Sequence, residues 1–312
     1  MFNVPSFFGF KGGSQTPFQF TVDTTIAGSS GVGNFALPLT TSTGLDCFVY
    51  WGDGSYDNIT SHTAPEVTHT YPSGGTYTIK ITGDLLGWQF NNGGDKLKMG
   101  EIQKWGALNI SVDLGFRGCS NMTCTATDAP TITSTSLEKY FLGCVNFNGS
   151  IGNWDLSNVD NIRGIFRDAS AFNQDISNWD VNNINNMINV FQNATSFNQP
   201  LNTWNTSSTT NFGQMFQGAT AFDQDISNWD INQANSFLNF MASVTLSTSN
   251  YDALLVGWEA NLQSAYPGGV GYPYTLNINF GGSQYTLGGA AATARTSLIN
   301  NFSWTITDGG GV

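Results

Sequence analysis

The chain has 312 residues, enough to bury a sizeable core in two or three units without metal ions or disulfide bonds. Only 10% of the residues are charged, and 22 acidic against 10 basic residues give a net charge of −12, which argues against nucleic acid as a partner. The 36 glycines and 23 phenylalanines disfavour helical bundles and favour strands, turns and stacked rings, so we expect a mainly β protein.

Residues 1–15 are rich in aromatic side chains and lack the basic start and apolar stretch of an export signal. The aromatic residues are Phe2, Phe7, Phe8 and Phe10. Nowhere in the chain do 18 apolar residues follow one another, so we expect no membrane insertion. We interpret residues 1–15 as an attachment segment whose phenylalanines bury in a neighbouring subunit.

Residues 16–87 alternate apolar and polar side chains in short runs such as 18–22 and 77–81, which predicts antiparallel strands. Trp51-Gly52-Asp53-Gly54 and the later His69-Thr70-Tyr71 resemble the polycystin-type (PKD) immunoglobulin-like domain. The resemblance implies a β-sandwich in which Asp53 supports a turn and His69 is structural. No nucleophile elbow lies near His62 or His69, so a hydrolase is not expected.

Residues 88–115 form a bridge without a Pro- or Ser-rich linker. The sequence Asn91-Asn92-Gly93-Gly94 is typical of a turn, and strand-like positions come after it at Ile102 and Trp105. We therefore expect the N-terminal module to be packed against the repeated part of the chain rather than tethered to it.

Residues 116–246 repeat with a period of 25, and the units 147–171, 172–196, 197–221 and 222–246 align without a gap. Aromatic residues occupy three columns of this alignment: Phe147, Phe172, Phe197 and Phe222; Trp154, Trp179, Trp204 and Trp229; and Phe141, Phe166, Phe191 and Phe216. Because one unit cannot bury its apolar side alone, we predict that the units stack and that the columns are core ladders rather than a sugar-binding platform.

Within a unit, Trp179-Asp180-Val181 reads as a short strand, whereas Ile184, Met187, Ile188 and Phe191 recur at helical spacing. Each unit is therefore predicted to be strand, turn and short helix. The predicted fold is a leucine-rich-repeat-type α/β solenoid, closed by a C-terminal capping segment at residues 247–312.

Aspartates also recur in the repeat, and carboxylates stacked from unit to unit are of the kind that bind calcium. Asp155, Asp180 and Asp230 follow the Trp in three units, and Asp175 and Asp225 precede it in two. Because Asn205 and Pro200 interrupt these columns, a solvated edge is favoured and no metal or cofactor is expected.

Cys119 and Cys144 are 25 residues apart, so they are predicted to be neighbouring core fillers, bonded or free. The four cysteines lack the paired spacing of a zinc site.

The motifs Phe-Asn-Gln-Asp-Ile-Ser-Asn-Trp-Asp-Val at 172–181 and Met-Phe-Gln-Gly-Ala-Thr-Ala-Phe at 215–222 resemble the BspA-like leucine-rich-repeat proteins, also described as a domain of unknown function. Residues 251–258 and 294–310 resemble the closing segment of the same family. The resemblance implies surface adhesins of bacteria and protists or proteins encoded by phages, without catalytic residues.

We therefore expect a non-enzymatic phage virion protein, either a head decoration or fibre or a tail-associated binder. Expected partners are other virion proteins, through residues 1–15, and a host-surface glycan or protein; self-association stays open. A bacterial cell-surface or secreted adhesin is the alternative, and an accessory binding module of an enzyme system is a more distant one.

Overall fold

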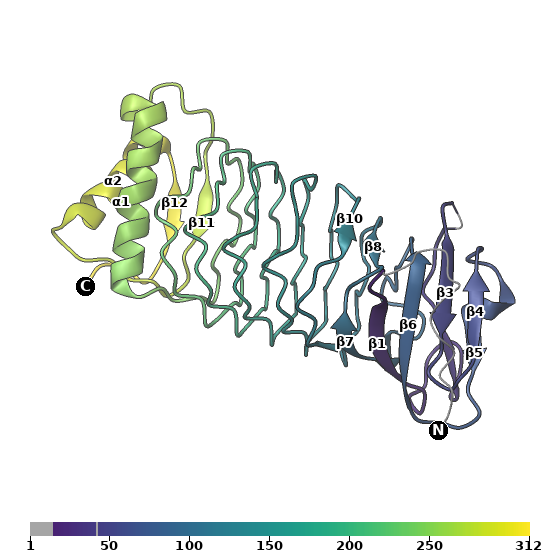
Figure 1. The fold of residues 1–312 in the computed structure, drawn as a ribbon. Coiled ribbons are helices and arrows are strands. Elements are labelled where there is room, and N and C mark those ends of the chain that lie inside the picture. Colours follow the sequence, from purple (N-terminus) through teal and green to yellow (C-terminus); the bar gives the residue numbers. More distant parts are fainter. Residues whose placement is uncertain (1–14, 42) are drawn as a thin grey trace.

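The computed structural model describes residues 15–41 and 43–312. A β-sheet module lies at one end, stacked coils of chain come next, and two helices lie at the far end (Figure 1). The proposed attachment residues Phe2, Phe7, Phe8 and Phe10 lie outside the described part of the chain.

A six-stranded mixed sheet forms the N-terminal module. Its order is β4 (Tyr56–Ile59), β3 (Asp46–Tyr50), β6 (Thr76–Asp84), β1 (Phe18–Asp23), β7 (Met99–Lys104) and β9 (Thr123–Cys124). The antiparallel strands predicted for residues 16–87 are present, but β7 and β9 lie beyond this range and pair in parallel. In β1 every second residue is buried, so Phe18, Phe20 and Val22 enter the core. The sheet is thus apolar on the face that receives the rest of the module.

A short second pair of strands covers part of this face. β2 (Asn34–Ala36) pairs antiparallel with β5 (Thr68–Thr70), which comes directly after the 3₁₀ turn η1 (Pro65–Val67). Phe35 of β2 is fully buried, and its ring centroid lies 6.1 Å from that of Phe20. The core of the module therefore lies between the large sheet and this pair.

The sheet continues without interruption into the coils. β7, which comes directly after the 3₁₀ turn η2 (Lys96–Lys98), pairs antiparallel with β1 and parallel with β9. β8 (Asn109–Ile110) and β10 (Thr131–Ile132) also pair in parallel. The prediction that the module is packed against the repeats rather than tethered to them is confirmed.

Successive coils are joined by backbone hydrogen bonds along one run of each coil, which we call the ladder segment. It comprises residues 136–143 and their equivalents every 25 residues. In one pair of coils, the N–H groups of Leu137, Lys139, Phe141 and Gly143 donate to the carbonyls of Asn161, Arg163, Ile165 and Arg167. The same four-bond pattern recurs between 161–168 and 186–193, and again in the next two pairs. In each of these bonds the N–H belongs to the earlier coil.

The predicted helix and strand of each unit are wrong. Between residues 133 and 247, all of them described, the structure contains turns and single parallel bridges such as Asn161↔Asn186. Asn189 and Asn193 have φ values of 60° and 59°, in the left-handed region, and the N–H of Asn189 donates to the next coil. A helix over 184–191 is excluded. Successive i→i+3 turns, and not a helix, account for the spacing of three and four between the apolar residues of this segment.

The aromatic columns stack from coil to coil. Ring centroids of Phe166 and Phe191 are 5.8 Å apart, and those of Phe172 and Phe197 are 5.9 Å apart with planes within 3°. The indole Nε1 of Trp179 donates to the carbonyl of Ile151 in the preceding coil at 2.9 Å. Trp204 and Trp229 repeat this bond in their own coils.

Two helices close the far end of the stack. α1 (Thr248–Ala265) is followed by η3 (Pro267–Gly269), β11 (Asn277–Asn279), α2 (Ala290–Phe302) and β12 (Thr305–Thr307), which pairs in parallel with β11. Trp258 of α1 donates its Nε1 to the carbonyl of Ile226 at 3.0 Å. It thereby makes the bond that a tryptophan of another coil would make, although it lies on a helix.

Replacement of Trp179 by Ala should lower the free energy of unfolding by about 3–5 kcal/mol, because it removes a buried ring from the middle of the stack. Trp179→Phe keeps an aromatic ring and removes the indole donor, so its loss should be smaller, about 1–2 kcal/mol. Urea unfolding followed by circular dichroism measures both. A loss below about 1 kcal/mol for Trp179→Ala would contradict the assigned role of the column.

Candidate functional site

The aromatic columns are core and not surface. All twelve residues predicted for the aromatic columns are at most 3% exposed. These are Phe147, Phe172, Phe197, Phe222, Trp154, Trp179, Trp204, Trp229, Phe141, Phe166, Phe191 and Phe216. A ligand cannot stack on these rings, so it would have to bind the mainly polar columns between them.

One polar column consists of side chains whose oxygens accept hydrogen bonds from the backbone of the next coil. The side-chain oxygen of Asn148 accepts from the backbone N–H of Asn173 at 2.9 Å, and Asn173 does the same for Asn198. Asn198 in turn accepts from the N–H of Asp223, and Asp223 accepts from the N–H of Ser247 beside α1. This column fixes the register of the coils and ends where the first helix begins.

The aspartates form turns. The Asp155 carboxylate accepts from the N–H of Ser157, and Asp180 accepts from Asn182, each at 3.0 Å. Asn205 makes the same bond to Ser207, so the position requires an oxygen acceptor rather than a charge. The backbone and hydroxyl bonds of Ser157 lower the pKa of Asp155 and outweigh its slight burial.

Asp175 accepts from the N–H of Ser177 in the same way. Within residues 15–41 and 43–312, no group of three or more His, Cys, Asp or Glu side chains is arranged to hold a metal ion.

The two conspicuous polar groups of the N-terminal module are structural. Nε2 of His69 lies 2.8 Å from Asp53 Oδ2 and 3.3 Å from Ser55 Oγ, so serine and aspartate meet the same ring nitrogen rather than opposite sides of the ring. That arrangement cannot relay a proton between them. The ring of His69 stacks on Trp51 at 4.7 Å, and Tyr71 donates its hydroxyl to the Trp51 carbonyl.

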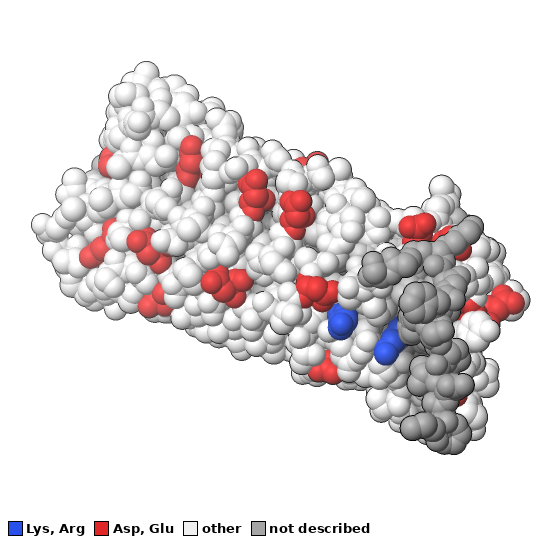
Figure 2. All heavy atoms as spheres, in the orientation of Figure 1, with Lys and Arg blue, Asp and Glu red and all other residues white. Residues whose placement is uncertain are grey.

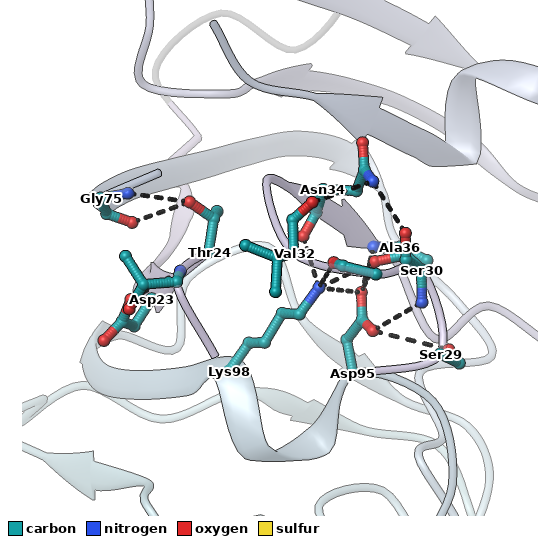
Figure 3. A network of polar contacts seen from close by, with 12 residues as sticks. Asp23, Thr24, Ser29, Ser30, Val32, Asn34, Ala36, Gly75, Asp95 and Lys98 are labelled. Carbon is teal, nitrogen blue, oxygen red and sulfur yellow. Dashed lines mark hydrogen bonds and ion pairs between the residues drawn. The ribbon is translucent and has the colours of Figure 1, made fainter. Parts of the chain in front are cut away.

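A second polar group, buried between η2 and the loop that precedes β2, is shown in Figure 3. Asp95 and Lys98 point toward each other and toward this loop, with both side chains fully buried and Nζ 3.4 Å from Oδ2. Lys98 donates to the carbonyls of Gly31 and Asn34 at 2.6 Å, and Asp95 accepts from the N–H of Ala36 at 2.8 Å. Nothing in the sequence singled out this pair, because its partners, which are backbone groups and the hydroxyl of Ser30, lie more than 58 residues away.

The cysteines are free thiols, and three of the four are buried. Cys144 Sγ donates to the carbonyl of Phe116, which lies in the same coil as Cys119, so the two cysteines lie on adjacent coils and are not bonded. Burial, aided by Asp46 and Asp84, raises the pKa of Cys47 to about 12. Burial likewise raises the pKa of Cys124 to about 11. Such thiols are poor nucleophiles near neutral pH.

Charge is spread unevenly over the molecule. Figure 2 shows acidic side chains along the visible face of the coils and Lys or Arg only toward the sheet end. No helix in the described part of the chain is long and apolar enough to cross a membrane.

Acid should weaken the turn at Asp53. Burial raises the pKa of Asp53, but hydrogen bonds from Ser55 and His69 outweigh it and lower the pKa from 3.8 to about 2. The lowered pKa stabilises the fold fully above pH about 4, and this contribution is lost as the pH falls toward 2. The difference in unfolding free energy between the wild type and Asp53→Asn should therefore shrink between pH 5 and pH 2. A difference that stays constant over this range would show that the carboxylate is not held in its charged form.

Removal of one member of the buried pair should be costly. Asp95→Ala leaves the Lys98 ammonium buried without its carboxylate, so the free energy of unfolding should fall by about 3–5 kcal/mol. The double variant Asp95→Ala/Lys98→Met should recover part of this loss. Glu138→Ala, which breaks a partly exposed pair with Lys139, is the control and should cost much less, about 1 kcal/mol. Equal losses for Asp95→Ala and Glu138→Ala would contradict the buried-charge account.

Comparison with known proteins places a family match in the coils. Residues 135–253 match the family described as "Mycoplasma protein of unknown function, DUF285". No curated protein and no solved structure matches the chain. Residues 135–253 are therefore a DUF285 domain, which begins at the ladder segment 136–143 and ends within α1.

Proposed function

We propose that the chain is a non-enzymatic structural and binding protein of a virion surface, either a head decoration or fibre or a tail-associated protein. In this proposal a PKD/immunoglobulin-like β-sandwich is followed by a leucine-rich-repeat-type solenoid with a C-terminal cap. The observation that carries it is the use of the repeated side chains: the aromatic columns are buried and the Asn148 column bonds coil to coil. In a scaffold of this kind the repeated side chains stabilise the stack of coils, and the outer surface that remains is long and polar.

The N-terminal module supports the same class of function. Its conspicuous polar residues, Asp53, Ser55 and His69, are bonded to one another around a turn. This is the role that the PKD resemblance implies for Asp53 and His69. A domain that uses its histidine in this way is suited to support or adhesion rather than to chemistry.

The proposed location rests on the composition of the N-terminal segment. Four of residues 2–10 are phenylalanines. Side chains of this kind gain most free energy when they are buried against another protein. We assign them to attachment, with other virion proteins as the partners.

The alternative is an adhesin on a bacterial cell surface. The match of residues 135–253 to a family described from Mycoplasma supports it. Fractionation distinguishes the two locations. Extracellular particles and cell envelopes of the producing culture are separated by density-gradient centrifugation and probed with an antibody to the chain. A virion protein is found with the particles, whereas an adhesin is found with the envelopes.

Deletion of residues 2–13 should abolish incorporation into particles and leave the melting temperature of the isolated protein nearly unchanged. Replacement of Phe2, Phe7, Phe8 and Phe10 by Ser should have the same effect, because it removes only the apolar side chains. Quantitative immunoblotting of purified particles measures copy number.

The matched control replaces Asn3, Ser6 and Lys11 by Ala and should be incorporated normally. Normal copy number of the truncated chain would contradict attachment through this segment. Failure of the truncated chain to fold would instead place the phenylalanines in the core of the module.

A further inference from the structure

The charges of the coils are sorted onto different sides. Between residues 112 and 246 the chain contains only four basic residues, and all four fall on ladder segments. They are Arg117, Lys139, Arg163 and Arg167. Of the eleven acidic residues in the same range, eight lie elsewhere on the coils. We call the four basic residues the basic patch.

The basic patch occupies three consecutive coils. Phe116 and Gly118, on either side of Arg117, donate their N–H groups to Tyr140 and Leu142, beside Lys139. Lys139 in turn donates its backbone N–H to the carbonyl of Arg163 at 2.8 Å. Because the ladder holds these backbones in register, Lys139, Arg163 and Arg167 are brought together by stacking although they are far apart in sequence. Arg117 lies at the edge of the basic patch, where its Nη1 donates to Asn91 Oδ1 at 2.9 Å.

Two guanidinium groups of the basic patch are poorly supplied with acceptors. Arg163 Nη1 lies 3.9 Å from Glu138 Oε1, and Arg167 Nε lies 3.4 Å from Asp168 Oδ2. Neither Nε has a hydrogen-bond partner among the described residues, although both atoms are buried. The side chains as a whole are 43% and 42% exposed. A guanidinium carries five N–H donors, and because each Nε is buried, the Nη donors of Arg163 and Arg167 are the ones that face an external acceptor.

The acidic residues within the basic patch are already engaged. The Glu138 carboxylate accepts a hydrogen bond from Lys139 Nζ at 2.6 Å, and the Asp168 carboxylate accepts from Asn193 Nδ2 at 2.8 Å. Burial raises the pKa of Glu138, but Lys139, Asn161 and Arg163 outweigh it and lower this pKa, which keeps the carboxylate charged. Asp113, on the same ladder segment as Arg117, accepts from Gln89 Nε2 at 3.4 Å, so four cations against three anions leave the basic patch with a net positive charge on a chain of net charge −12.

Amide side chains adjoin the basic patch on the same ladder segments. A Cβ atom placed on Gly164 would lie 3.4 Å from Cγ of Lys139, 3.8 Å from Cβ of Arg167 and 4.0 Å from Cβ of Asn189. Asn189 starts a cluster in which its amide donates to Gln192 and Gln214, both of which bond to Gln217. Cationic donors are thus followed directly by neutral groups that both donate and accept.

We propose that the basic patch and the adjoining amides bind an acidic polysaccharide, with Arg163 and Arg167 holding its carboxylate or phosphate groups. Planar guanidinium groups bind such anions through paired hydrogen bonds. Sugar hydroxyls need both donors and acceptors, which Gln214 and Gln217 supply at the partly exposed end of the amide cluster, while Asn189 and Gln192 are buried and hold them in place. The inference deepens the proposed binding function by naming its ligand class and the side of the coils that is used.

The test measures binding of the full chain to fluorescein-labelled polygalacturonate by fluorescence anisotropy at low and physiological salt. Arg163→Gln/Arg167→Gln should raise the dissociation constant at least tenfold and reduce its salt dependence. The matched control Lys80→Gln/Lys104→Gln removes the same charge from exposed positions on β6 and β7 and should leave the dissociation constant within about twofold. Circular dichroism checks that both variants fold.

Further probes separate the sources of the anion. Neutral dextran should not bind, and a phosphorylated dextran that binds more tightly than polygalacturonate would identify phosphate as the group that is recognised. Tight binding of poly-L-glutamate without polygalacturonate binding would overturn the proposal in favour of an acidic protein segment. If both double variants lost affinity for polygalacturonate equally, the proposal would be overturned, because the effect would then depend only on the net charge of the chain. Absence of any polyanion binding, while the chain still incorporates into particles, would overturn this inference and leave the proposed function standing.

Discussion

The constant distance between one coil and the next is the constraint on which the rest of the structure depends. Each coil must return to the same place above its predecessor, so that an indole such as Trp204 reaches a carbonyl 28 residues earlier and stacked phenylalanines remain about 6 Å apart. A coil one residue longer would displace both the rings and the side-chain oxygens that bond from coil to coil. This explains why aromatic, amide and turn-forming positions all share the period of 25.

The two ends of the stack satisfy this constraint in different ways. At the N-terminal end, β7 pairs both with β1 of the sheet and with β9, so the first coils are extensions of the sheet. At the C-terminal end, α1 lies across the last coil and supplies Trp258 in place of the next tryptophan. Both ends therefore protect the core by making the same kinds of contact as a further coil would make: strand pairing at one end and an indole hydrogen bond at the other.

Sequence periodicity predicted the period, the buried columns, the neighbouring cysteines and the strands of the N-terminal module, because each of these is determined by which side chains must leave water. It did not predict the path of the backbone within a coil. The spacing of Ile184, Met187 and Phe191 is shared by a helix and by successive i→i+3 turns, and only the left-handed backbone of Asn189 distinguishes them. The basic patch was also missed, because its members are brought together by stacking and not by proximity in the sequence.

The direction of the ladder bonds gives the ladder segments an electric polarity, although backbone bonds elsewhere on the coils, such as Asn185 N–H to the Asp160 carbonyl, run the opposite way. In the ladder segments the bonded N–H groups point toward α1 and the carbonyls that accept them point toward the sheet module. Each peptide unit has a dipole of about 3.5 D, and dipoles aligned in this way add, as they do along a helix axis. The sheet end of the ladder is consequently its negative pole and the helical end its positive pole. Arg117, Lys139, Arg163 and Arg167 all lie in the coils nearest the negative pole, where the field of the backbone favours cations.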